Sequence, residues 1–281
     1  MSRPSLTSLP RPFICGVLRD PDPTQAIATI KNSEYDGAQA FLLHLSCVDR
    51  QYRNVEDLRK IMSSTTRPIL VLNYREHGYQ PDEERVDELL QAVEAGAAAI
   101  DIPADTYDPD PADWMGGTKV DPYDTRPREL SKDPQVIEKQ RRLIKRIQNA
   151  GAEVLLSSHT RIVMSAEAVV EHALEMATRE PDMIKIVSVA LNEDHVVEAF
   201  RATVLLKRTL KQPFLFMCHG VNGKLTRVVN PMLGSMMVLC NQRYTAQTLH
   251  EQPLIHAMRS VFQNVDWSVP LPAGGETFDK A

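Results

Sequence analysis

Lys185 has the clearest chemical potential in this sequence. It lies in the apolar run Met183–Val189 (MIKIVSV), which predicts a buried strand. An ammonium group loses its hydration in such a place, so burial should lower the pKa of the amine and favour its neutral form. A neutral amine is the nucleophile that forms an imine, or Schiff base, with a ketone. The alternative is a structural lysine whose ammonium reaches solvent or pairs with a carboxylate at the strand end.

His159 supports the chemical interpretation of Lys185. It follows the preceding apolar run, Glu153–Ser157, in the segment EVLLSSHT. Parallel strands that follow one another in a barrel are neighbours, so His159 should reach a substrate held on the lysine. A neutral imidazole can move protons during imine formation and then remove a proton next to the imine carbon. A histidine at a strand end is by itself more often a structural hydrogen-bonding residue.

Eight short apolar runs could position these side chains, and amphipathic segments with helical spacing separate them. This alternation predicts an α/β fold, a single-domain (β/α)8 TIM barrel. A doubly wound open sheet is the alternative, but the sequence contains neither GxGxxG nor GxxxxGK[ST]. The predicted strands are Phe13–Val17, Phe41–Cys47, Ile69–Tyr74, Ala98–Ile102, Glu153–Ser157, Met183–Val189, Phe214–His219 and Met236–Cys240.

The predicted barrel spans residues 13–265, between an N-terminal tail (1–12) and a C-terminal tail (266–281). The N-terminal tail is rich in Pro and Ser and has no apolar core of a secretory signal. A long loop insertion, residues 103–131, is rich in Pro, Asp and Gly and follows the fourth strand. It should therefore lie at the carboxyl-terminal face, where barrel active sites lie. Trp114 and Tyr123 could anchor it as an active-site lid, and an oligomer contact is the alternative.

Composition narrows the class of partner. The formal net charge is −5 and the pI about 5.9, which argues against nucleic-acid and anionic-membrane binding. No apolar run reaches the roughly 18–20 residues of a membrane span. The four cysteines form no CxxC pair and lie in predicted strands, so we expect buried thiols in a cytoplasmic protein. The cysteines are Cys15, Cys47, Cys218 and Cys240.

Three segments resemble the type I 3-dehydroquinate dehydratases: EVLLSSHT, MIKIVSVA and FMCHGVNGKLTRVVNPMLGS. The resemblance is good over about residues 150–250 and looser before them. It implies that Lys185 forms the Schiff base, that His159 is the catalytic histidine and that Arg227 grips the substrate carboxylate. It further implies a homodimeric lyase of the shikimate pathway or of quinate metabolism, which removes water from 3-dehydroquinate. Such chemistry needs no metal and no organic cofactor.

The resemblance also assigns further substrate-binding residues. Gln247 matches a glutamine in a loop that closes on the carboxylate, and Thr245 is an approximate counterpart of its serine. Arg75 matches an arginine that contacts substrate hydroxyls.

Other positions depart from the family. The second strand of the family carries a Glu-x-Arg pair, whereas this chain offers His44 and Ser46. Asp101 is kept on the fourth strand, but Pro103 replaces a glutamate, and His219 replaces a methionine. The imine-forming residues and the carboxylate clamp are therefore expected, with a rebuilt pocket for the rest of the substrate.

Three other functions remain open from the sequence. Class I aldolases also place an imine-forming lysine on the sixth strand of a barrel, and retro-aldol cleavage of a hydroxy-keto acid differs only in the bond broken. A metal-dependent barrel enzyme could use His44, Asp101, His159 and His219 to hold Zn²⁺ or Mn²⁺. The third is a non-catalytic sensor of sugar acids. A sensor needs no nucleophile, so the presence of both Lys185 and His159 argues against this function.

Overall fold

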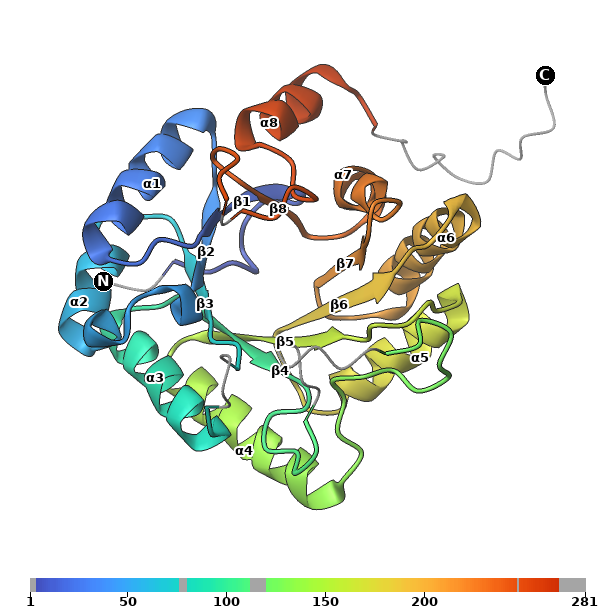
Figure 1. Cartoon of the computed structure of the whole chain (residues 1–281), viewed down its shortest axis with the longest axis horizontal. Helices are drawn as coiled ribbons and strands as arrows, with labels where there is room; N and C mark the ends of the chain where they lie inside the picture. The colour runs from blue at the N-terminus through green and yellow to red at the C-terminus, as the bar shows by residue number, and fades with distance from the viewer. Residues whose placement is uncertain (1–3, 76–79, 112–119, 247, 268–281) are drawn as a thin grey trace, which may run out of the picture.

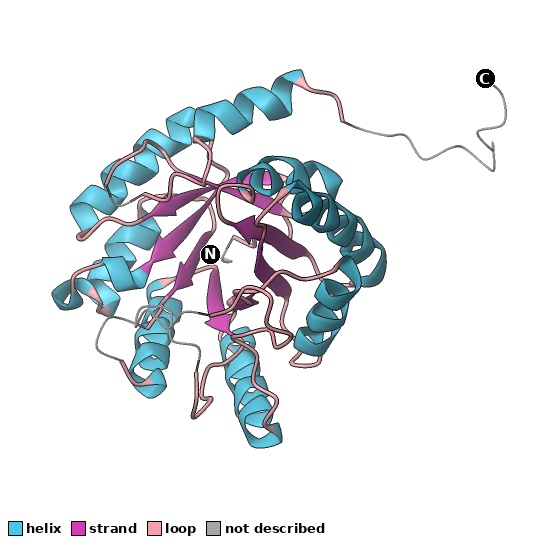
Figure 2. Ribbon diagram, turned by 45° about the vertical axis from the view of Figure 1, so that its right-hand side comes forward, coloured by secondary structure: helices cyan, strands magenta, loops and turns pink. Residues whose placement is uncertain are grey.

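The computed structural model describes residues 4–75, 80–111, 120–246 and 248–267. Eight parallel strands alternate with helices, so the predicted (β/α)8 barrel is confirmed. Figure 1 looks into the ring of strands with the helices outside it, and Figure 2 distinguishes the two layers by colour. The strands are β1 (Phe13–Leu18), β2 (Ala40–His44), β3 (Ile69–Leu72), β4 (Ala99–Pro103), β5 (Glu153–His159), β6 (Met183–Val189), β7 (Phe214–His219) and β8 (Met237–Cys240). The α-helices are α1 (Pro23–Asp36), α2 (Val55–Ser63), α3 (Asp82–Ala95), α4 (Pro134–Asn149), α5 (Ala166–Ala177), α6 (Glu193–Thr209), α7 (Lys224–Leu233) and α8 (Ile255–Asn264).

Hydrogen bonds run continuously through the sheet in the order β7-β6-β5-β4-β3-β2-β1-β8. At the remaining seam, the backbone N–H of Met236 donates to the carbonyl of Phe214 (2.7 Å). The N–H of Phe216 donates to the Ser235 hydroxyl (3.0 Å). These bonds satisfy the edge of β7 and bring the start of β8 against it, so the barrel is nearly closed.

Side chains alternate strictly between two apolar layers, as the period of a strand requires. One buried cluster lies inside the barrel and takes every second residue of each strand, for example Cys15, Leu42, Leu155 and Met183. The other cluster lies between the strands and the surrounding helices. Lys185 shares the inward register of Met183 and Val187, so the fold directs its side chain into the barrel.

Two strands end earlier than predicted. β2 ends at His44, and residues Leu45–Cys47 form a 3₁₀ turn, which places Ser46 and Cys47 outside the strand. β3 ends at Leu72. The apolar alternation continues past both ends because the following residues still line the barrel mouth. Cys15, Cys218 and Cys240 are buried as predicted, whereas Cys47 is half-buried, and all four are free thiols.

The N-terminal segment covers the bottom of the barrel. Leu6 is fully buried against the inner apolar cluster. Its N–H donates to the Glu153 carboxylate (2.8 Å), which also accepts from the hydroxyls of Ser5 and Thr7. Residues 5–9 therefore form part of the barrel and not a loose tail.

Candidate active site

A cavity of about 640 Å³ opens at the carboxyl-terminal ends of the strands. It brings together seven residues that the sequence predicted for the site, from six different segments of the barrel. Its lining comprises Arg19, Leu42, His44, Ser46, Cys47, Leu72, Tyr74, Arg75, His159, Lys185, Val187, Met217, His219, Arg227, Leu239, Leu249 and Gln252. The apolar walls and few convergent polar groups are typical of a small-molecule site.

Lys185 forms a buried ion pair in this cavity. Its Nζ lies 2.9 Å from Oδ2 of Asp101, which faces it from β4. Lys185 is 4% exposed and Asp101 is 1% exposed, so the pair is shielded from water. Burial alone lowers the pKa of the amine, but Asp101 and Tyr74 outweigh it and the net shift is upward. The predicted downward shift was therefore wrong, because the prediction considered burial and did not pair the amine with Asp101.

Tyr74 connects Lys185 to His159. Its hydroxyl accepts a hydrogen bond from Lys185 Nζ (3.2 Å) and lies 3.0 Å from Nε2 of His159. On the other side of the ring, Nδ1 of His159 lies 2.7 Å from Oε2 of Glu129. A carboxylate only accepts hydrogen bonds, so Nδ1 carries the proton and Nε2 of the neutral ring accepts from Tyr74. The four side chains form a chain of hydrogen bonds from amine to carboxylate.

The electrostatics favour this protonation pattern. Burial, with the charge of Lys185 nearby, lowers the pKa of His159 well below the ordinary value of histidine. Burial raises the pKa of Tyr74 above that of an ordinary phenol. His159 is therefore a neutral proton acceptor, and Tyr74 keeps its proton and can only pass one along.

Glu129 comes from the loop between β4 and α4, and the sequence analysis did not single it out. It is 3% exposed and has a φ of 55°, a left-handed conformation that side-chain-bearing residues rarely adopt. Its neighbours fix it to the barrel: Arg128 N donates to Thr160 O (3.0 Å), and Ser131 N donates to Ala104 O (3.0 Å). Strain held in place by surrounding bonds is typical of functional positions.

Part of the predicted lid can be compared with the structure. Residues 112–119, including Trp114, lie outside the described residues. Tyr123 is 65% exposed and so does not anchor the loop as predicted. The anchored part is the segment 128–131, which delivers Glu129 to the site.

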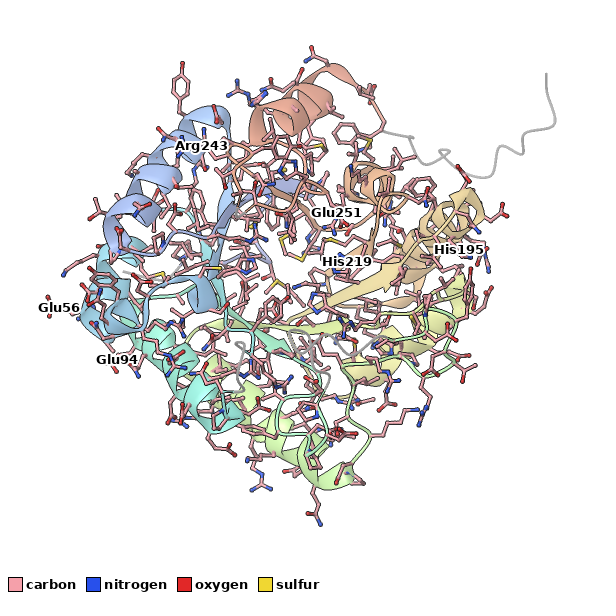
Figure 3. The ribbon with its side chains drawn as sticks, in the orientation of Figure 1. Glu56, Glu94, His195, His219, Arg243 and Glu251 are labelled. Carbon is pink, nitrogen blue, oxygen red and sulfur yellow. The ribbon has the colours of Figure 1, made fainter. Side chains whose placement is uncertain are left out.

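Arg227 reaches the cavity from α7 and meets a carboxylate of the chain itself. Its Nη2 lies 2.9 Å from Oε2 of Glu251, in the segment between β8 and α8. The same carboxylate lies 3.2 Å from Nδ1 of His219 and accepts from the N–H of Gly220 (3.0 Å). Figure 3 shows Glu251 and His219 near the barrel axis, with Arg243 farther out. Like Tyr74 and Glu129, Glu251 was not predicted as a site residue from the sequence.

The sequence model of the type I 3-dehydroquinases matches residues 14–265. This chain belongs to the type I 3-dehydroquinase family. The family consists of carbon–oxygen lyases, so the predicted class of enzyme is confirmed. No curated protein sequence is significantly similar to the chain.

Solved 3-dehydroquinate dehydratases have a similar fold. The Clostridium difficile enzyme, solved with covalent modified comenic acid, is 15% identical with a TM-score of 0.72, covering 94% of this chain and 98% of its own. The 3-dehydroquinate dehydratase from Geobacillus kaustophilus HTA426 is 14% identical with a TM-score of 0.69, covering 90% of each chain. The enzyme from Enterococcus faecalis is 15% identical with a TM-score of 0.66, covering 92% and 95%.

The structure places only some of the other predicted substrate-binding residues at the cavity. His44 and His219 line the cavity from β2 and β7, and Ser46 lines it from the turn after β2. Gln247 lies outside the described residues. Thr245 is described but is not part of the cavity lining; its N–H lies 2.8 Å from the Thr248 hydroxyl.

Arg75 lines the cavity, but its guanidinium serves a buried ion network. Nη1 lies 3.1 Å from Asp105 Oδ2, and Nη2 lies 3.0 Å from Asp82 Oδ2. Asp82 also pairs with Arg85 (2.7 Å) and accepts from the N–H of Tyr107 (2.6 Å). The network joins β3, α3 and the segment after β4 beneath the mouth of the site.

Asp82→Asn is expected to lower the free energy of unfolding by about 3 kcal/mol, because it leaves two buried guanidinium groups without their shared charge. Burial raises the pKa of Asp82, but Arg85 and Arg75 outweigh it and the net shift is downward. Its contribution is therefore present above the unfolded pKa of about 4 and is lost as the pH falls through the folded value. Urea unfolding at pH 7 and pH 3 measures both effects. The exposed Asp87→Asn on the same helix should change the free energy by less than about 0.5 kcal/mol; equal effects would contradict this assignment.

The alternative metal site does not converge. Among residues 4–75, 80–111, 120–246 and 248–267, no three His, Cys, Asp or Glu side chains are placed to hold a metal ion. Asp101 pairs with Lys185, and His159 is bonded to Tyr74 and Glu129. Across the same ranges, no helix is long and apolar enough to span a membrane.

Proposed function

We propose that this 3-dehydroquinase acts through a Schiff base on Lys185 and converts 3-dehydroquinate, or a close hydroxy-keto acid, into an enone and water. The observation that carries the proposal is the hydrogen-bond chain from the Lys185 amine through Tyr74 to His159. In this proposal Lys185 is the nucleophile, Tyr74 passes protons and His159 is the base, and all three side chains line one cavity. The proposed reaction uses no metal and no organic cofactor.

The first step makes the amine nucleophilic. Lys185 is an ammonium ion in the free enzyme because Asp101 faces it at 2.9 Å. A proton passes from Lys185 to the Tyr74 oxygen while the Tyr74 proton moves to Nε2 of His159. The amine becomes neutral, and the new imidazolium is stabilised by Glu129 at Nδ1.

Imine formation then uses the same groups. The Lys185 nitrogen attacks the ketone carbon to give a carbinolamine, and the imidazolium protonates the departing hydroxyl, which leaves as water. The product is a cationic imine that takes the place of the ammonium beside Asp101. The ion pair observed in the free enzyme therefore preorganises a negative charge for this intermediate.

Elimination follows from the electron-withdrawing imine. Neutral His159 removes a proton from the carbon next to the imine carbon, and the electron pair moves into the resulting enamine. The enamine expels the β-hydroxyl, which the imidazolium protonates, so a second water leaves. Attack of water on the conjugated imine frees the enone and restores Lys185.

The carboxylate of the substrate needs a cation in the cavity. The resemblance assigns this role to Arg227. Arg19 and Arg75 also line the cavity, and Arg75 is paired with Asp82 and Asp105. The walls facing Lys185 are mainly apolar, with Leu42, Leu72 and Leu239. In the family, a Glu-x-Arg pair on the second strand binds the hydroxyl groups of the substrate. This chain has His44 and Ser46 there, so it offers fewer groups that can bind those hydroxyls.

Proton NMR of a reaction with 3-dehydroquinate tests the proposal. We expect a new vinyl proton and loss of the methylene proton next to the ketone. Substrate that carries deuterium at that methylene carbon should form product at a lower rate if removal of this hydrogen limits turnover. Cleavage into two carbonyl fragments would favour the retro-aldolase alternative, and an unchanged spectrum with a panel of hydroxy-keto acids would contradict both.

Tyr74→Phe tests the relay directly. It removes the hydroxyl and keeps the ring between His44 and His159, so we expect imine formation to slow by about 10- to 100-fold with little loss of stability. Rapid-quench borohydride trapping measures that rate. Tyr35→Phe, at a tyrosine that is 87% exposed, is the matched control and should leave the rate unchanged. An unaltered rate in Tyr74→Phe would show that another group takes the proton.

We further propose a homodimer and a cytoplasmic location, as the family resemblance implies. Light scattering of the purified chain tests the first. A monomer at micromolar concentration would contradict it.

A further inference from the structure

The three arginines of the cavity differ in how their charge is balanced, and Arg75 is paired with Asp82 and Asp105. Arg227 is 4% exposed and is bound on one side by Glu251, with its Nη1 against the Met217 sulfur (2.7 Å). Glu251 is itself held by His219 and by the N–H of Gly220. These contacts lower the pKa of Glu251 to about 2 against the effect of burial, so the carboxylate is ionised near neutral pH. Arg227 therefore already holds an anion.

Arg19 has no such partner. It follows β1 at the cavity wall, and its Nη1 donates to Oε1 of Gln252 (3.3 Å). Within the described ranges of the chain, no carboxylate forms an ion pair with it. A guanidinium stays charged even where burial lowers its pKa, so Arg19 presents an unbalanced positive charge to the cavity.

Arg19 and Lys185 bracket the cavity. They follow or lie on β1 and β6, which are not neighbours in the sheet. His44 on β2 lies near both, since the positive charges of Arg19 and Lys185 each lower its pKa, although less than burial does. The cavity lining, among the described residues, contains no aspartate or glutamate, so an acid group of a ligand can meet the Arg19 guanidinium without a competing carboxylate of the lining.

We infer that Arg19, and not Arg227, binds the acid group of the substrate while its carbonyl carbon meets Lys185. This inference rests on the proposed function, because it takes Lys185 as the imine-forming residue. It defines the substrate class as a keto acid that places its carbonyl carbon at Lys185 and its acid group at Arg19. Arg227 with Glu251 then shapes one wall of the cavity and contributes no net charge to ligand binding.

The experiment compares 3-dehydroquinate with its methyl ester, which keeps the ketone and lacks the negative charge. Borohydride trapping as a function of concentration gives the preference for acid over ester. We expect the wild-type chain to prefer the acid by about 10- to 100-fold, as for a charged hydrogen-bonded pair. Arg19→Met should reduce this preference to near unity, because trapping of the acid weakens far more than trapping of the ester. The exposed Arg243→Met, in the segment after β8, is the matched control and should keep the preference.

Two results would overturn the inference. One is an acid preference that persists in Arg19→Met. The other is a tenfold or larger gain in acid trapping in Glu251→Gln, because that gain would show that Arg227 binds the acid once its partner is removed.

Calorimetry with quinate, which has the carboxylate and no ketone, separates this inference from the proposed function. Binding that is lost in Arg19→Met supports the inference even if the wild-type chain forms no borohydride adduct, in which case only the Schiff base fails. Binding that Arg19→Met leaves unchanged overturns the inference while the Schiff base stands on its own trapping result.

Discussion

Lys185→Met is expected to abolish turnover of 3-dehydroquinate, with kcat/KM reduced on the order of 10⁴-fold or more. The substitution removes the nucleophile and keeps most of the side-chain volume within the inner apolar cluster. Steady-state kinetics and borohydride trapping both measure the effect. Residual activity within tenfold of the wild type would contradict the Schiff-base mechanism.

Folding must be separated from catalysis in this variant, because Asp101 would lose its buried partner. Breaking a buried pair costs about 3–5 kcal/mol. The double variant Lys185→Met/Asp101→Asn removes both charges and should regain most of that free energy of unfolding while staying inactive. If the double variant is folded and active, Lys185 is not the nucleophile.

Glu129→Gln is expected to have the second-largest effect, a fall in kcat of about 10²- to 10⁴-fold with KM little changed. The carboxylate holds the proton on Nδ1 of His159 and stabilises the imidazolium. An amide can present its NH2 group to Nδ1 and reverse the tautomer, so that Nε2 no longer accepts a proton. The acidic limb of the pH–rate profile should also move to lower pH, because the imidazolium loses its anion.

The exposed Asp121→Asn in the same loop is the control for Glu129→Gln. Its side chain accepts from the N–H of Tyr123 (3.0 Å), a bond that an asparagine oxygen can keep. We expect wild-type kcat and an unchanged pH profile. A pH profile of Glu129→Gln that matches the wild type would show that Glu129 acts only on the fold.

The barrel could be predicted from the sequence because each strand is a short apolar run followed by a helical segment. The alternation of inward- and outward-facing residues along the strands also indicates two further site residues. Tyr74 and Asp101 stand at even spacing from inward-facing Leu72 and Ala99, just as Lys185 does from Met183. Counting every second residue along β3 and β4 predicts that Tyr74 and Asp101 face into the barrel, as Lys185 does. An inward-facing carboxylate near the lysine would then have predicted the upward shift of its pKa.

Other parts of the site depend on loops and could not be predicted this way. Glu129 stands in a segment with many acidic residues, and only the fold shows that it meets His159, 30 positions along the chain. The pairing of Arg227 with Glu251 is likewise a contact between separate loops, so the motif that identified the arginine gave no sign of its partner. Composition could not show where β2 ends, since the apolar Leu45 continues the pattern into a 3₁₀ turn.

The most direct measurement is borohydride reduction of the wild-type chain in the presence of 3-dehydroquinate, followed by intact mass and peptide mapping. From the Schiff-base mechanism we expect one reduced adduct per chain, on the peptide that contains Lys185, and none in Lys185→Met. An adduct on a different lysine, or turnover of 3-dehydroquinate with no adduct on any residue, would contradict it.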